Sequence, residues 1–141
     1  MKLVICGSTA FRKQKVELVQ KLFEMGIEGI IDPWTVELSK GENPELLKQI
    51  QREHFEAKKQ YGFIKWYHKA IVDSDGILVY NSSKNGIDGY IGANSFLEIF
   101  DAYIGEKKIF LYFNLPQQDY IRDELLTMES VVINGDLNKI K

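Results

Sequence analysis

Short apolar runs alternate with longer segments of helical periodicity along the chain, and this alternation restricts the fold more than any other feature. The apolar runs predict five strands, at 2–6, 29–31, 77–80, 108–113 and 131–133. Strands that alternate with helices favour a parallel sheet with right-handed crossovers and helices on both faces. We therefore expect an α/β fold, a flavodoxin-like three-layer sandwich whose five-stranded parallel sheet has the order 2-1-3-4-5.

Helix signals fill the gaps between these runs. Apolar stripes predict five helices, at 11–25, 44 to about 60, 63–71, 95–104 and 119–128. Asn43 and Pro44 form a typical helix start, Gly62 breaks the helical pattern, and Gly26 and Gly105 are placed to end helices. No linker or repeat interrupts the 141 residues, so we expect one domain spanning 1–141.

Composition narrows the possible partners. Lys and Arg number 18 against 20 Asp and Glu, and the basic residues are scattered, so we expect no binding to nucleic acid. The single Cys6 excludes an intramolecular disulfide, and no Cys or His spacing indicates a metal site. The apolar start at 1–7 is too short for a signal peptide or a membrane span. A cytoplasmic protein without membrane contact is expected.

The segment 85–98 carries the strongest functional signal. It follows the predicted strand at 77–80, contains glycines at 86, 89 and 92, and leads into an amphipathic helix that carries Glu98. Open α/β sheets bind ligands beyond the carboxyl ends of their strands, at the point where the strand order reverses. Gly7 and Ser8 should then face the same crevice as this loop and Glu98. A carboxylate in that place is a candidate nucleophile or general base.

Glu98 also has a purely structural interpretation. Ser95 and Glu98 match the capping box, in which the glutamate bonds back to the backbone N–H of the serine. The two roles are compatible, because a carboxylate in the first turn lies near the positive end of the helix dipole. The dipole is expected to keep such a carboxylate ionised at neutral pH.

The turn Gly7-Ser8-Thr9 has two open interpretations. Its backbone N–H groups and hydroxyls could bind an anion, or it could be an ordinary strand-to-helix turn with a capping hydroxyl. It matches neither the phosphate-binding loop of nucleotide hydrolases nor the dinucleotide fingerprint. These mismatches argue against an ATPase and against an NAD enzyme.

Four further side chains have a structural and a functional interpretation. Asp88 could contact a ligand or simply form the turn beside Gly89. For His54 and His68, partly buried structural roles are favoured over proton transfer. For Trp34, packing against the long helix is favoured over stacking on a planar base.

Together these pieces resemble the nucleoside 2-deoxyribosyltransferase superfamily, which includes the 2′-deoxynucleoside 5′-phosphate N-hydrolases. The opening strand and turn at 5–8, the Asp-led central strand at 73–80 and the segment at 92–109 carry the likeness. The order of elements is similar over nearly the whole chain. In that family a glutamate attacks the anomeric carbon of deoxyribose, and water or a second base resolves the resulting ester.

The resemblance implies roles for particular residues. Glu98 would be the nucleophile, Gly7, Ser8 and Gly92 would line the nucleotide site, and Asp88 or Asn94 would hold sugar hydroxyls. It implies a small nucleoside or nucleotide as substrate, no cofactor and no metal, and a homo-oligomer in which a neighbour helps close the site.

One departure from the family leaves a second hypothesis open. Family members usually carry an Asp in the helix before the central strand, where this chain reads Trp66-Tyr67-His68. Tyr67 or His68 would have to take its place. The alternative is a nucleotide-binding sensor module on the same fold that turns nothing over.

Overall fold

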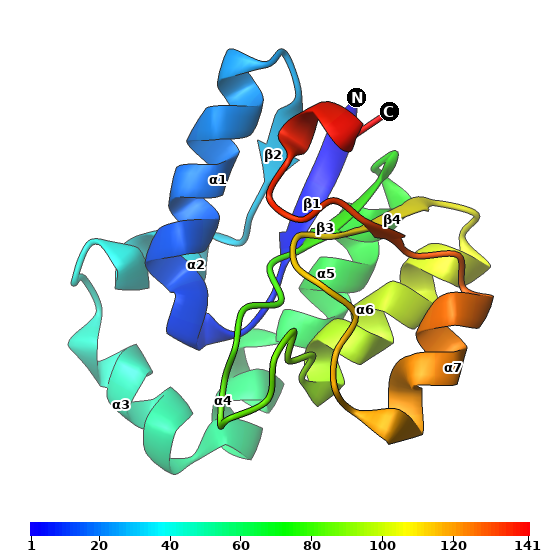
Figure 1. Cartoon of the computed structure of the whole chain (residues 1–141). Coiled ribbons are helices and arrows are strands. Elements are labelled where there is room, and N and C mark those ends of the chain that lie inside the picture. The colour runs from blue at the N-terminus through cyan, green and yellow to red at the C-terminus, as the bar shows by residue number, and fades with distance from the viewer.

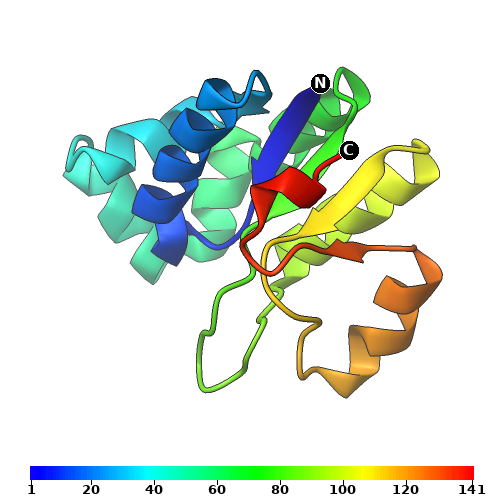
Figure 2. The same cartoon turned by 45° about the horizontal axis from the view of Figure 1, so that its top comes forward.

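The computed structural model describes all residues, 1–141, and contains one sheet of five parallel strands (Figure 1, Figure 2). The strands are β1 (Lys2–Cys6), β2 (Glu28–Ile30), β3 (Gly76–Val79), β4 (Lys108–Leu111) and β5 (Val131–Val132). Their order is β2-β1-β3-β4-β5. The predicted α/β, flavodoxin-like architecture is confirmed, with each strand placed within two residues of its expected bounds.

Seven α-helices connect the strands. They are α1 (Arg12–Glu24), α2 (Pro33–Ser39), α3 (Pro44–Arg52), α4 (His54–Tyr61), α5 (Phe63–Val72), α6 (Ala93–Ile104) and α7 (Asp119–Thr127). The chain also forms two short 3-10 turns. The first, η1 (Thr9–Phe11), precedes α1, and the second, η2 (Leu137–Lys139), lies near the C-terminus. No helix is both long and apolar enough to cross a membrane.

Two helix predictions were wrong. The segment at 44–60 forms two helices, because Glu53 leaves helical geometry with φ −131° and ψ 56°. The sequence analysis also missed α2. There the Asp32 carboxylate accepts a hydrogen bond from the Thr35 backbone N–H at 2.7 Å, and Pro33 occupies the first helical position.

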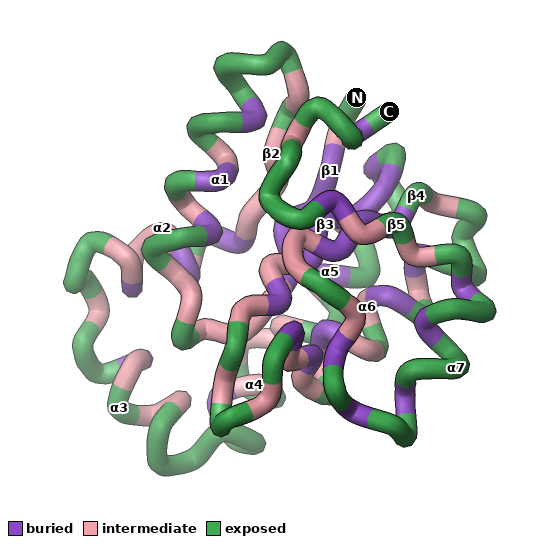
Figure 3. The backbone as a smooth tube through the Cα atoms, in the orientation of Figure 1, coloured by how far each residue is buried: buried purple, intermediate pink, exposed green.

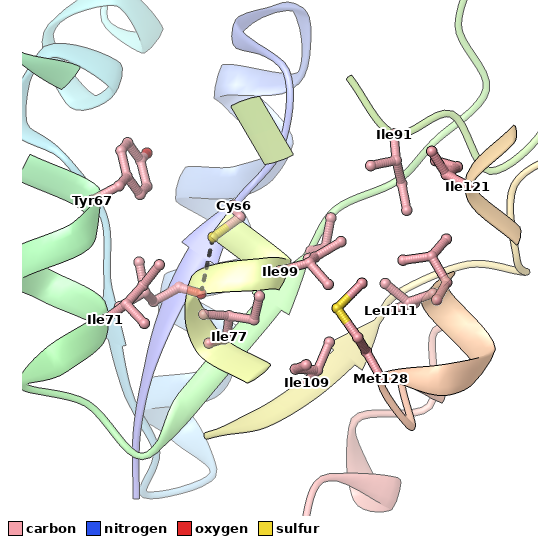
Figure 4. Close-up of a cluster of buried hydrophobic side chains, with 14 residues drawn as sticks. Cys6, Tyr67, Ile71, Ile77, Ile91, Ile99, Ile109, Leu111, Ile121 and Met128 are labelled. Carbon is pink, nitrogen blue, oxygen red and sulfur yellow. Dashed lines mark hydrogen bonds between the residues drawn. The ribbon is translucent and has the colours of Figure 1, made fainter. Parts of the chain in front are cut away.

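The hydrophobic core has two faces, one on each side of the sheet. Alternate residues of β1 illustrate this, since Leu3 and Ile5 pack under α1 and the C-terminal segment, whereas Val4 and Cys6 pack under α5, α6 and α7. The second face contains the larger cluster (Figure 4). The central strands are buried along nearly their whole length, and the exposed backbone lies in the outer turns and helices (Figure 3).

The register of β1 and β3 sets the position of the crevice. Cys6 lies opposite Val79, so both strands end at the same level and Gly7 meets Tyr80. A β-carbon on Gly7 would approach the Tyr80 carbonyl oxygen to 2.8 Å, and the Gly7 φ of +139° disfavours any side chain. The loop after β3 (green) and α4 lie at this end of the sheet, away from the two termini (Figure 1).

Gly76 tests how tightly the neighbouring strands β3 and β4 pack. A β-carbon there would lie 2.5 Å from the Lys108 carbonyl oxygen of β4, so Gly76→Ala should lower the free energy of unfolding by about 1–3 kcal/mol. Urea unfolding measures this change. Gly105→Ala is the matched control, because its β-carbon meets nothing closer than 3.4 Å and φ is −80°. Equal stability of the two variants would contradict the packing argument.

Candidate active site

A cavity of about 630 Å³ opens beyond the carboxyl ends of β1, β2 and β3. Its wall is built from the β1–α1 turn, α2, the α3–α5 segment, the loop before α6 and the first turns of α6. This is the size of typical small-molecule sites. Six of the seven residues predicted for the site line it: Gly7, Ser8, Tyr67, Gly92, Asn94 and Glu98. Asp88 does not.

Glu98 faces the cavity from the second turn of α6. The helix begins at Ala93, with Gly92 in the N-cap position and no side-chain cap, so Ser95 lies inside the helix. The capping-box prediction for Glu98 was therefore wrong. The helix starts early because the extended Gly92 already accepts a hydrogen bond from the Phe96 N–H at 3.0 Å.

The environment of Glu98 favours its neutral form more than the sequence indicated. Burial of the carboxyl group raises the pKa of Glu98 to about 7, and the nearby Asp32 and Asp101 act in the same direction. The Cys6 thiol and the Lys15 ammonium group oppose this rise. Glu98 is thus about half ionised at neutral pH, and the expectation of a fully charged first-turn carboxylate was wrong.

Lys15 supplies a buried positive charge near Glu98. It comes from α1, is only 2% exposed, and its Nζ donates to the Gly7 carbonyl oxygen at 2.9 Å. Burial lowers the pKa of Lys15, whereas the Asp32 and Glu98 carboxylates raise it. The sequence analysis missed this residue. The available signal was its spacing, because Lys15 shares the buried side of α1 with Leu18 and Leu22.

Asp32 is a second carboxylate in the cavity that the sequence analysis did not select. Besides capping α2, it accepts hydrogen bonds from the Thr35 hydroxyl at 2.7 Å and from the Tyr67 hydroxyl. Burial, followed by the charges of Asp32 and Glu98, raises the pKa of Tyr67 well above its ordinary value. Tyr67 is therefore a permanent hydrogen-bond donor in the wall, held in place by Asp32. The signal was an Asp-Pro pair at the end of a predicted strand.

Two buried amides anchor the loop that leads to Gly92. Asn81 donates to the Asn114 carbonyl oxygen and accepts from the Phe113 N–H, both at 2.8 Å. Gln118 accepts from the Ile91 N–H at 2.8 Å and donates to the Ile91 carbonyl oxygen at 3.0 Å. The loop is thereby fixed to the ends of β4 and α7.

Asp88 lies outside the cavity wall. Its carboxylate accepts a hydrogen bond from the exposed Ser83 hydroxyl at 2.8 Å, and Asp88 itself is exposed. Gly89, beside it, has φ +66°, and a β-carbon there would lie 2.5 Å from the Asn114 carbonyl oxygen. This geometry favours the turn-forming interpretation of Asp88 over the sugar-binding one.

The predicted partial burial of the two histidines was wrong. His54 and His68 are both exposed, where partial burial was expected. His54 lies in the cavity wall, whereas His68 is outside it and its Nδ1 lies 2.8 Å from an Asp101 carboxylate oxygen.

Trp34 both packs and lines the cavity. Its ring makes edge contacts with Tyr61, Phe63 and Trp66, at the end of α4 and in α5. It also belongs to the cavity wall, so one part of the ring system remains available to a ligand. The favoured packing role and the stacking role are therefore compatible.

No family model, curated protein or solved structure matches the chain. The likeness to the nucleoside 2-deoxyribosyltransferase superfamily stays a prediction that rests on the motifs. No group of three or more His, Cys, Asp or Glu side chains is placed to hold a metal ion.

The raised pKa of Glu98 predicts a pH-dependent stability. An unfolded glutamate ionises near 4.5 and the folded one at about 7, so between these values the folded state binds more protons. Wild-type stability should fall by at most about 3 kcal/mol as the pH rises through this window. Glu98→Gln should lack that fall and become the more stable protein above pH 7. Parallel pH dependence of the two proteins in urea unfolding would contradict the assignment.

Proposed function

We propose that the protein cleaves or exchanges the N-glycosidic bond of a 2′-deoxynucleoside or its 5′-monophosphate, with Glu98 as nucleophile. The observation that supports this most is the place of the Glu98 carboxyl group. It lies in a cavity at the carboxyl ends of the central strands, close to the Gly7 turn. The motif resemblance assigns the nucleophile to the same residue.

The proposed reaction has two displacements. The Glu98 carboxylate bonds to the anomeric carbon as the C–N bond breaks, and the base leaves with the bonding electron pair and takes up a proton from water. Water or a second base then attacks the same carbon and releases the Glu98 carboxylate. The negative charge of Glu98 stabilises the oxocarbenium-like transition states of both steps, and no metal or organic cofactor is required.

Lys15 and Tyr67 support this chemistry in different ways. The Lys15 charge favours the ionised form of Glu98, which opposes the effect of burial. Tyr67 presents a hydroxyl whose proton is directed to Asp32, so Asp32 acts as a positioning residue for the wall of the site. Ser8 and Asn94 are polar residues of the cavity wall that can contact the sugar.

A nucleotide sensor remains the second candidate function, and the state of Asp32 favours it. Apart from Glu98, Asp32 is the only carboxylate in the cavity wall, and it already accepts hydrogen bonds from Thr35 and Tyr67. No second carboxyl group is therefore free to protonate the leaving base. A sensor would be stabilised by nucleotides in thermal-shift measurements without releasing any base.

We expect activity to depend on Glu98 and on its ionisation. Glu98→Gln should reduce base release from a panel of deoxynucleosides and deoxynucleotides by at least about a thousandfold, because the amide cannot form the ester. Wild-type kcat/KM should rise with pH through about 7, as the carboxyl group ionises. Chromatography of the free base measures both.

Glu124→Gln is the matched control for this experiment, since Glu124 is exposed on α7 and lies outside the cavity. It should retain full activity. Base release that survives Glu98→Gln would reject the mechanism.

We also propose a homo-oligomer, in line with the resemblance, and a cytoplasmic location, in line with the lone buried Cys6. One side of α6 carries exposed apolar residues at helical spacing: Leu97 (50% exposed), Phe100 (54%) and Ile104 (63%). Ala93 continues this row to the cavity wall. A neighbour on this surface would bury the row and lie beside the mouth of the site.

The double variant Leu97→Glu, Phe100→Glu tests this interface. Charges on a buried apolar surface should convert the oligomer to a monomer in analytical ultracentrifugation, with the far-UV circular dichroism unchanged. Tyr120→Glu, a change of an exposed aromatic residue on α7, should leave the assembly intact. A monomeric wild-type protein at the concentrations of the activity assay would contradict the proposal.

A further inference from the structure

Lys15 is the one lysine or arginine side chain that the fold removes from solvent. Its exposed fraction is 2%, whereas every other lysine and arginine is at least partly exposed. The side chain comes from α1 and lines the cavity. A lysine is almost never fully buried unless a carboxylate pairs with it. The partners of Lys15 therefore decide what this residue can do.

No carboxylate lies close enough to Lys15 to form a salt bridge. The structure contains two salt bridges, and neither includes this residue. The Lys15 Nζ donates one hydrogen bond, to the Gly7 carbonyl oxygen at 2.9 Å. That acceptor is uncharged, and a neutral amine can donate to it as well as an ammonium group can. The burial of a permanent charge is thus not offset by a direct ionic partner.

This environment favours the neutral amine of Lys15. Burial lowers the pKa of Lys15, and the more distant charges of Asp32, Glu98 and Cys6 oppose this change without cancelling it. A lower pKa increases the fraction of free amine, which is the nucleophilic form of a lysine. Buried lysines of this kind attack carbonyl carbons and form Schiff bases, which are imines.

Glu98 supplies the second group that imine formation needs. The oxygen of the carbonyl compound leaves as water only after it has taken up a proton, so an acid must be present in the same cavity. Glu98 lines the cavity, and its pKa of about 7 leaves about half of the carboxyl groups protonated at neutral pH. A glutamate that ionised near its ordinary value of 4.5 would hold almost no proton at that pH.

The cavity around Lys15 suits a small polyhydroxy ligand. Its volume of about 630 Å³ is typical of small-molecule sites. Ser8, Thr9 and Asn94 place hydroxyl and amide groups in the same wall, where they can bond to hydroxyl groups of a ligand. An aldose in its open-chain form carries several hydroxyl groups and one aldehyde. It is therefore the class of carbonyl compound that this wall favours.

We propose that the Lys15 amine forms an imine with the C1 aldehyde of an aldose in the cavity. The Lys15 nitrogen bonds to the aldehyde carbon and gives a carbinolamine. Glu98 then protonates the carbinolamine hydroxyl, which leaves as water while the C=N bond forms, and the resulting iminium returns one proton to the Glu98 carboxylate. This activity goes beyond the cleavage of an N-glycosidic bond, because it requires no nucleobase and gives Lys15 a covalent role.

Reductive trapping on the wild-type protein tests this proposal. Sodium cyanoborohydride reduces an iminium to a stable secondary amine, so incubation with 2-deoxyribose and this reagent should attach the sugar to Lys15. Peptide mapping by mass spectrometry should show that Lys15 is modified at least about tenfold faster than Lys21, an exposed lysine on the same helix. A smaller ratio of the two rates would overturn the proposal.

Two variants separate the nucleophile from the acid. Lys15→Arg keeps a positive charge but cannot form an imine, because the guanidinium group is not deprotonated, so the rapid modification should disappear from the intact protein mass. Glu98→Gln keeps the amine and removes the acid, so it should slow the modification of Lys15 at least about tenfold and leave the rate at Lys21 unchanged. Glu124→Gln, outside the cavity, should change neither rate. Equal rates at Lys15 in Glu98→Gln and wild type would contradict the proposed acid.

The imine and the glycosidic chemistry can fail separately, because trapping uses a free sugar. If Lys15 is modified rapidly while no base is released from any nucleoside or nucleotide, the imine stands and the glycosidic chemistry falls. If bases are released while 2-deoxyribose modifies Lys15 no faster than Lys21, the glycosidic chemistry stands and the imine falls.

Discussion

The alignment of β1 with β3 is the constraint on which the site depends. Because Cys6 lies opposite Val79, both strands end together, and the chain can leave β1 only through a residue without a side chain, Gly7. The strand order reverses at this point, so β1 feeds α1 on one face of the sheet and β3 feeds α6 on the other. A slip of one residue would exchange the two faces of β1 and bury the wrong side chains.

Burial and charge–charge attraction have opposite effects on the ionisation of Glu98 and Lys15, near the ends of these strands. Desolvation favours a neutral Glu98 and a neutral Lys15, whereas their mutual attraction favours both charged forms. Asp32 is held by its own donors and adds negative charge to the same region. The result is a carboxyl group that changes charge near neutral pH, whereas an exposed glutamate would be ionised throughout that range. Such a shift is typical of functional sites.

The strands and their order could be predicted because apolar runs and helical stripes are local patterns. The α3–α4 break could not, since Glu53 is flanked by ordinary helix-forming residues without Gly or Pro. The site was predicted in part. Gly7 and Glu98 were found from their neighbours in sequence. The local patterns at Lys15 and Asp32 indicated a buried lysine and a helix start, but the contacts of these side chains with Gly7 and Tyr67 are visible only in the structure. The sequence analysis placed Glu98 in the first turn of a helix that begins at Ser95. In the structure Gly92 is the N-cap, so Glu98 lies in the second turn of α6.

The break at Glu53 has a consequence for how a ligand reaches the cavity. The break separates α3 from α4, two helices of nine and eight residues that form part of the cavity wall. Each is too short to persist as a helix without packing. Most residues of α3 and α4 are at least partly exposed, and only Leu46 and Ala57 are fully buried. The α3–α4 segment can therefore unfold locally while the sheet stays intact. The backbone amides of α3 and α4 should exchange hydrogen faster than those of β1 and β3. Entry to the cavity would then be governed by the weakest part of the molecule, independently of its global stability.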